Sequence, residues 1–149
     1  MVVDGYIELV GSDERRAIQA VKSATRVEKA QLSLSAIRFE GANTVSLHLE
    51  TGPLPPSISV KSADLFLAIA DDSDESHVSR GENAGRTLKH VAVLRDLVPV
   101  GTVDSTGRFS RDITVNLNNG NRRNLRIVAI IQERAAGRVL GVGSARVSN

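Results

Sequence analysis

The side chains of this sequence that could do chemistry gather between His77 and Arg95, in the segment HVSRGENAGRTLKHVAVLR. Imidazole, carboxylate and guanidinium groups can exchange protons or hold anions and metal ions. Because the segment mixes all three, these side chains could converge as ligands or as an acid–base set. The candidate ligand-binding residues are His77, Arg80, Glu82, Asn83, Arg86, His90 and Arg95.

The elements around these residues favour a structural role for them. Leu88–Val98 alternates between apolar and polar residues, which predicts a half-buried strand. Arg80–Arg86 precedes it, and Gly81 and Gly85 can adopt the positive φ that a tight turn needs. A hydrogen-bonded, salt-bridged loop that fixes the start of the strand is therefore the favoured interpretation, because buried polar groups need partners.

No metal, cofactor or catalytic residue is assigned from the sequence. His77 and His90 fall on different segments, which is unlike the paired spacing of histidine metal ligands. The acidic residues of Asp71–Glu75 could offer oxygen ligands to Ca²⁺, but the glycine and distal glutamate of a calcium loop are missing. A solvated acidic turn is expected there, and His48 is expected on the solvent face of its strand.

Composition narrows the functional classes. The 149 residues include three Phe, one Tyr and no Trp, so aliphatic side chains must build the core. The net charge is +2, and the basic cluster Arg122-Arg123 with Arg126 has no aromatic residues interleaved. Nucleic-acid binding is therefore not expected. The absence of cysteine excludes a disulfide, a thiol nucleophile and a thiolate metal site within these residues.

The chain carries no recognisable targeting pattern. Its start lacks the basic, apolar and small-residue order of a secretory signal. Purely apolar runs such as Ile127–Ile131 are too short to span a bilayer, so no membrane span is expected.

The first residues predict a small ββα unit. Met1–Val3 and Tyr6–Val10 read as strands joined by an Asp4-Gly5 turn, and Asp13–Ala24 reads as a helix with Ser12 as its N-cap. Two strands and one helix are marginal alone. The unit must therefore pack on the rest of the chain or belong to a domain whose beginning is missing.

The remainder reads as β structure. The pattern indicates a register shift near Ile37 and a strand with apolar residues on both faces at Ala63–Ala70. Leu125–Gln132 is the most buried strand by composition, and Arg138–Val147 is weakened by Gly141 and Gly143. We therefore predict an α+β, mostly β fold, with a ββα segment at 1–26 and an antiparallel β-sandwich at 27–149.

Three blocks in this order resemble a known family. MVVDGYIELVGSD before an alanine-rich helix, SRGENAGRTLKHVAVLR and the closing RVLG are similar to the carboxyl-terminal half of DUF1223 proteins. The resemblance implies exported bacterial proteins of uncharacterised function, with a thioredoxin-like domain followed by a β-sandwich. Residues 1–26 would then be the last two strands and final helix of the thioredoxin-like domain. The location implied is periplasmic or secreted, or cytoplasmic if Met1 is the true start.

The Cys-x-x-Cys pair of that family is absent, so the resemblance transfers no catalytic residue and implies no cofactor. Two functions remain. The first is a non-catalytic sandwich that supports or presents substrate to a redox domain, with that domain or a second copy bound through the incomplete N-terminal sheet. The alternative is a free-standing binding module for an anionic ligand, a glycan or a metal. No Gly-x-Ser-x-Gly or His-Glu-x-x-His motif indicates a hydrolase.

Overall fold

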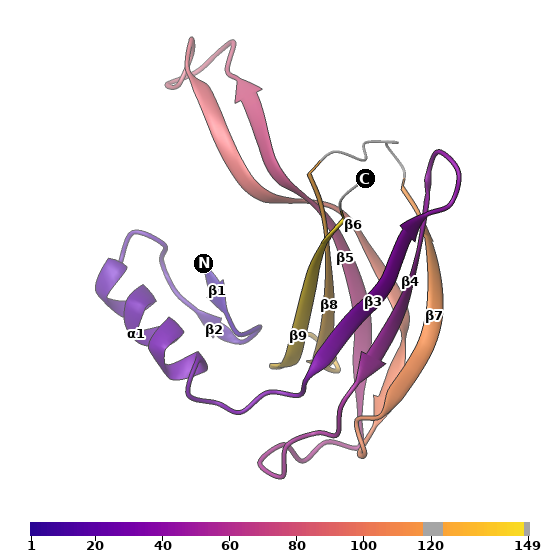
Figure 1. Ribbon diagram of the computed structural model, residues 1–149. Coiled ribbons are helices and arrows are strands. Elements are labelled where there is room, and N and C mark those ends of the chain that lie inside the picture. Colours follow the sequence, from indigo (N-terminus) through magenta and orange to yellow (C-terminus); the bar gives the residue numbers. More distant parts are fainter. Residues whose placement is uncertain (118–123, 148–149) are drawn as a thin grey trace.

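Two packed antiparallel sheets form the body of the protein, and a small hairpin and a helix lie beside them (Figure 1). This computed structural model describes residues 1–117 and 124–147. One sheet has the strand order β3-β4-β7 and the other β6-β5-β8-β9. The predicted α+β, mostly β fold with antiparallel sheets is confirmed. The elements are β1 (Val2–Val3), β2 (Ile7–Glu8), α1 (Glu14–Ala24), β3 (Leu32–Phe39), β4 (Thr44–Thr51), β5 (Ser62–His77), β6 (Thr87–Asp104), β7 (Phe109–Asn116), β8 (Leu125–Glu133) and β9 (Val139–Val147).

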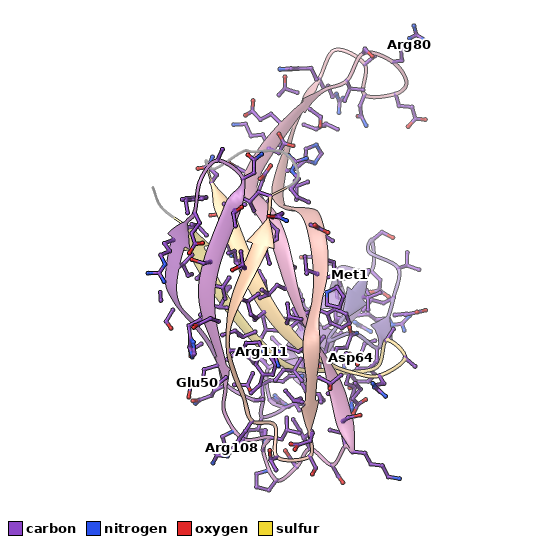
Figure 2. All side chains as sticks on the ribbon, turned by 90° about the vertical axis from the view of Figure 1, so that its right-hand side faces the viewer. Met1, Glu50, Asp64, Arg80, Arg108 and Arg111 are labelled. Carbon is purple, nitrogen blue, oxygen red and sulfur yellow. The ribbon has the colours of Figure 1, made fainter. Side chains whose placement is uncertain are left out.

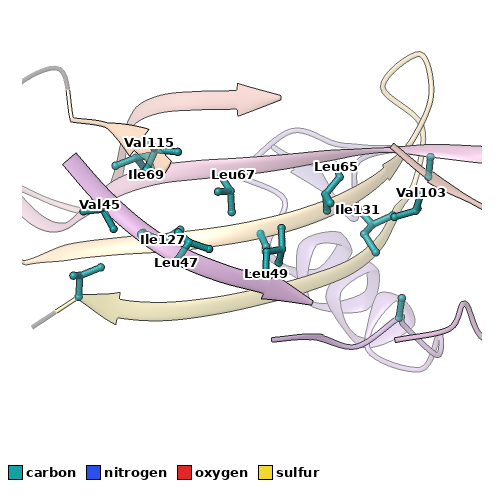
Figure 3. Packing of buried hydrophobic residues seen from close by; sticks show 14 of the residues in the cluster. Val45, Leu47, Leu49, Leu65, Leu67, Ile69, Val103, Val115, Ile127 and Ile131 are labelled. Carbon is teal, nitrogen blue, oxygen red and sulfur yellow. The ribbon is translucent and has the colours of Figure 1, made fainter. Parts of the chain in front are cut away.

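Aliphatic side chains from alternate strand positions fill the space between the two sheets (Figure 3). A strand directs successive side chains to opposite faces, so every second residue of a central strand reaches the core. The predicted strand Leu125–Gln132 is confirmed as β8 and shows this alternation. The core residues of the three strands that contribute most are Val45, Leu47, Leu49, Ala63, Leu65, Leu67, Ile69, Leu125, Ile127, Ala129 and Ile131.

One predicted turn is wrong. The acidic segment Asp71–Glu75 is not a loop but part of β5. The shift near Ile37 is confirmed, because the β3–β4 register changes between Ser35 and Arg38. The composition of residues 118–121 also predicts a loop, and these residues and the basic pair 122–123 lie outside the described residues.

Strands β5 and β6 continue past the sandwich as a two-stranded arm, which comprises residues Ser73–Val91. Pairing of β5 with β8 ends at Asp71, whereas pairing of β5 with β6 continues to His77. The arm projects from one end of the body (Figure 1). Leu88–Val98 is confirmed as strand, but its first residues lie in the arm rather than in the core, and Val91 is 80% exposed. Local alternation does not reveal whether a second sheet covers a strand.

The edge of β9 is closed by the start of β3, and two glycines allow this approach. Ala30 donates from its backbone N–H to the Leu140 carbonyl, 2.8 Å away. A Cβ on Gly143 would lie 2.6 Å from the Leu32 carbonyl oxygen, and one on Gly141 would lie 2.7 Å from that of Ala30. The glycines that were expected only to weaken this strand therefore permit two backbones to cross.

The ββα unit forms as predicted, with shorter strands and a different cap. Asp4 and Gly5 both have positive φ, 56° and 81°, as the turn requires. Asp13, not Ser12, caps α1, and its carboxylate accepts a hydrogen bond of 3.0 Å from the Arg16 N–H. Asp13 is placed one residue before the first helical residue, where its oxygen reaches an unpaired N–H of the first turn. No helix in the described ranges is long and apolar enough to cross a membrane.

A compact set of contacts attaches this unit to the β8–β9 turn. The Asp4 carbonyl accepts from the Val139 N–H at 2.9 Å. The Asp4 carboxylate receives Lys29 Nζ at 2.6 and 2.7 Å, and Lys29 also donates to the Val139 carbonyl. Gly5 lies so close to Gly137 that an added Cβ would be 2.6 Å from the Gly137 oxygen. The division at residues 26 and 27 into two domains stays a prediction.

An ion pair spans the same β8–β9 turn. Glu133 Oε1 accepts from Arg138 Nε at 3.1 Å, and Oε2 accepts from the Arg138 backbone N–H at 3.2 Å. The side-chain hydrogen bond from Arg138 holds the pKa of Glu133 below its ordinary value, and partial burial opposes this shift.

We expect Gly143→Ala to destabilise the sandwich by about 1–3 kcal/mol, because the new methyl group must displace the Leu32 backbone. Urea unfolding followed by circular dichroism measures the change. Gly11→Ala is the matched control, since its Cβ would meet no atom closer than 4.0 Å. Equal stability of the two variants would contradict the close crossing of β3 and β9.

Glu133→Gln should flatten the acid limb of the stability profile. A carboxyl whose pKa is lower in the folded than in the unfolded protein stabilises the fold above its unfolded pKa, about 4.3 for Glu. That stabilisation is lost as the pH falls through the folded pKa. Urea midpoints measured from pH 7 to pH 3 should therefore fall less steeply for the variant than for the wild type. Parallel profiles would show that Arg138 does not shift this group.

Candidate functional site

The tip of the arm is a tight turn built on the two glycines that the sequence singled out. Gly81 and Gly85 have φ of 87° and 80°, as predicted. The Gly85 N–H donates to the Val78 carbonyl at 2.8 Å, and the Val78 N–H donates to the Arg86 carbonyl at 3.0 Å. The prediction that this turn leads directly into a core strand is wrong. The turn lies at the far end of the arm, where Figure 2 labels Arg80. Of the residues between the strands, 79–86 are exposed and Val78 is half-buried.

Polar side chains at the tip make few contacts with one another. Arg86 Nη1 lies 3.4 Å from Asn83 Oδ1. Arg80, Glu82, Asn83 and Arg86 are all exposed. The turn is therefore held by backbone hydrogen bonds, and its charged groups face solvent.

The two histidines of the arm lie on opposite faces of the ribbon. His77 pairs with Thr87 and His90 with Asp74, and the two β5 positions, 77 and 74, differ by an odd number. His77 Nδ1 is 2.9 Å from Thr87 Oγ1, and His90 Nε2 is 2.9 Å from Ser76 Oγ. The hairpin register thus separates two side chains that are close in the sequence.

Arg95 lies at the base of the arm, apart from the tip residues, and joins two aspartates of β5. Its Nε donates to Asp71 Oδ2 at 2.7 Å and its Nη2 to Asp74 Oδ2 at 2.9 Å. Asp71 is only 4% exposed, so its charge needs this partner. The pKa of Asp74 is lowered, first by the Glu75 backbone N–H and then by Arg95, and the pKa of Arg95 is raised, chiefly by Asp71.

A second set of contacts at this base was not predicted. The Asp72 carboxylate forms ion pairs with Arg126 of β8 and with Arg146 of β9. Arg146 Nε lies 2.6 Å from Asp72 Oδ2. The Asp72 N–H also donates to the Asn124 carbonyl at 2.7 Å. The acidic segment that was expected to be a solvated turn is therefore a strand whose three aspartates each contact arginine. The residues next to Asp72 in the sequence do not predict these ion pairs, because Arg126 and Arg146 come from strands far along the chain.

The seven candidate residues thus occupy three places: the arm tip, the two faces of the ribbon and the arm base. As ligand-binding residues they stay a prediction. A hollow beside the ribbon is lined by Ser73, Asp74, Glu75, Lys89, His90 and Val91. In residues 1–117 and 124–147, no group of three or more His, Asp or Glu side chains is arranged to hold a metal ion. His48 is bound on its own sheet, 2.7 Å from Asp112 and 3.2 Å from Ser110.

Arg95→Met should destabilise the protein by about 2 kcal/mol, because it leaves the buried Asp71 carboxylate without its cation. Arg38→Met is the matched control, since the Arg38–Glu40 pair is 3.7 Å apart and exposed, and should cost less than about 0.5 kcal/mol. Urea unfolding at pH 7 compares the two. Similar midpoints would mean that the base of the arm does not depend on Arg95.

Among the comparisons with known proteins, the likeness to one solved structure agrees with the fold. In the search of solved structures, HBP35 of Porphyromonas gingivalis matches with a TM-score of 0.60 and 10% identity, over 87% of this chain and 46% of that chain. A β-glucosidase from Kluyveromyces marxianus matches with a TM-score of 0.35 and 9% identity, over 81% of this chain and 14% of that one. No curated protein matches. The sequence model described as "Protein of unknown function (DUF1223)" matches residues 1–132, and the chain therefore belongs to the DUF1223 family.

Proposed function

We propose that the β-sandwich is a non-catalytic structural module that holds a thioredoxin-like redox domain and presents substrate to it. In this proposal β1, β2 and α1 are part of the redox domain, and the assembly acts outside the bacterial cytoplasm. The chain contributes position and rigidity, while the thiols come from polypeptide outside these 149 residues, which contain no cysteine.

The short strands and exposed apolar side chains of the ββα unit support this proposal. Its strands have two residues each, and they pair only with each other in the described chain. Val2, Val10, Ile18 and Val21 are 59%, 69%, 47% and 47% exposed. A two-stranded hairpin is at best marginally stable alone in water. Apolar side chains on both the strands and the helix suit burial against further elements of the same domain.

The observation that carries the proposal is the attachment of this unit to the sandwich. Lys29, the Val139 N–H and the close contact of Gly5 with Gly137 fix the Asp4 turn to the β8–β9 turn. Among the described residues, these contacts hold the Asp4 turn, while Val2 of β1 and Ile18 and Val21 of α1 stay exposed. This is the arrangement expected of a joint between a sandwich and a domain that grows from β1, β2 and α1.

A fusion tests the proposal. The segment of another DUF1223 protein that contains Cys-x-x-Cys is joined in frame before Met1, and amide hydrogen exchange is compared with that of the chain alone. Exchange in β1, β2 and α1 should slow by about ten-fold or more, because these elements become part of a complete sheet. The fusion should also reduce the disulfides of insulin, which the chain alone should not.

Asp4→Ala in the fusion should lower this protection, because it removes the carboxylate that Lys29 holds. Asp112→Ala is the matched control, since the Asp112 side chain is 93% exposed and lies on the other sheet. Unchanged exchange in β1, β2 and α1 on fusion would overturn the proposal.

A further inference from the structure

The outer faces of the two sheets differ in chemistry. Cross-strand partners in a sheet share one face, so the register shows which residues lie together. On the sheet of β3, β4 and β7, the outward rows are polar. They comprise Ser33, Glu50 and Ser110, then Ser35, His48 and Asp112, then Arg38, Ser46 and Thr114. This face has the composition of a surface that meets water.

The middle of the outer face of the four-stranded sheet is apolar. One row joins Pro99, Phe66, Ile130 and Val142, and the next joins Leu97, Ala68, Val128 and Ser144. None of these side chains belongs to the core between the sheets. We call this set the outer patch: Phe66, Ala68, Leu97, Pro99, Val128, Ile130 and Val142. The apolar residues on both faces of Ala63–Ala70 were the sequence signal for it.

Exposure and surroundings give the outer patch the form of an interface. Val142 and Leu97 are 53% and 49% exposed, although they lie beside half-buried Phe66, Val128 and Ile130. The pair Asp72–Arg146 borders the patch at one end, and the pair Asp64–Arg134 borders it at the other. An apolar centre between charged rims is typical of a surface that another polypeptide covers.

The ββα unit lies on the same side of the molecule as the outer patch. In Figure 1, β1, β2 and α1 lie beyond β8 and β9, on the side away from β3, β4 and β7, and Figure 2 agrees. In Figure 1 the arm leans to this side. The unit is attached at the turn that joins β8 to β9, two of the strands that carry the patch. Structure added to β1, β2 and α1 would therefore extend next to this face.

We propose that the outer patch is the seat of the domain that β1, β2 and α1 belong to. This inference rests on the proposed function and adds the surface through which the sandwich holds its partner. The apolar side chains of the patch become buried against that domain, and its charged rims face the domain's edge. The sandwich then contacts the domain through two surfaces, the Asp4 joint and the patch, which fixes its orientation.

The test compares the same substitutions in two settings. Leu97→Glu and Val142→Glu place a carboxylate in the outer patch, either in the chain alone or in the fusion described above. In the chain alone both positions are exposed, so the melting temperature should change by less than about 2 °C. In the fusion the carboxylate would be buried without a partner, so the melting temperature should fall by about 4 °C or more. Thr114→Glu on the polar outer face is the matched control and should have a small effect in both settings.

Each outcome separates this inference from the function on which it rests. Equal shifts in both settings, with β1, β2 and α1 protected in the fusion, would overturn the patch and leave the proposed function standing. A fusion without that protection would overturn both. A chain that is dimeric by light scattering, and that Leu97→Glu converts to a monomer, would assign the patch to a second copy and overturn the inference.

Discussion

Burial of aliphatic side chains between the two sheets is the interaction on which the rest of the structure depends. With three Phe and no Trp in the chain, the core consists of Leu, Ile, Val and Ala from facing strands. Each large side chain that is fully buried contributes about 1.5–3 kcal/mol. The core side chains of β4, β5 and β8 must therefore stay in register with one another, and this register determines where the arm begins. The arm begins where β5 loses β8 as a neighbour, and the arginine–aspartate contacts lie at that boundary.

The strand pattern could be predicted because it is local. The pattern of apolar residues located the strands at Ala63–Ala70, Leu88–Val98 and Leu125–Gln132, and Asp4-Gly5 located the first turn. The nature of Asp71–Glu75 could not be predicted in this way. Four acidic residues in five positions resemble a solvated loop, and only pairing with β6 and contact with distant arginines make them a strand. Contacts between residues that only the fold brings together cannot be predicted from the spacing of neighbouring residues.

The candidate site shows the same limit. The glycines of its turn were recognised from their type, because a positive φ is a property of the single residue. Whether His77 and His90 meet depends instead on hairpin register, and the register places them on opposite faces. The ββα unit and the apolar strand Ala63–Ala70 carried more functional information than the charged segment. In our proposal, the exposed apolar side chains of the unit and of the outer patch are where this sandwich meets a neighbour, whereas the fold shared with HBP35 at 10% identity indicates no activity.

Several alanines with a left-handed backbone conformation limit which substitutions this sequence can accept. Among the described residues, Ala36, Ala92, Ala135 and Ala136 have φ between 50° and 59°. Such a conformation costs an L-residue about 1–2 kcal/mol, and β-branched residues tolerate it least. These positions lie at the β3 shift, at the base of the arm and in the β8–β9 turn. Substitution by glycine or asparagine should be tolerated at these positions, whereas valine or isoleucine should be strongly disfavoured. The bends in the sandwich therefore restrict which residues can occupy these exposed sites.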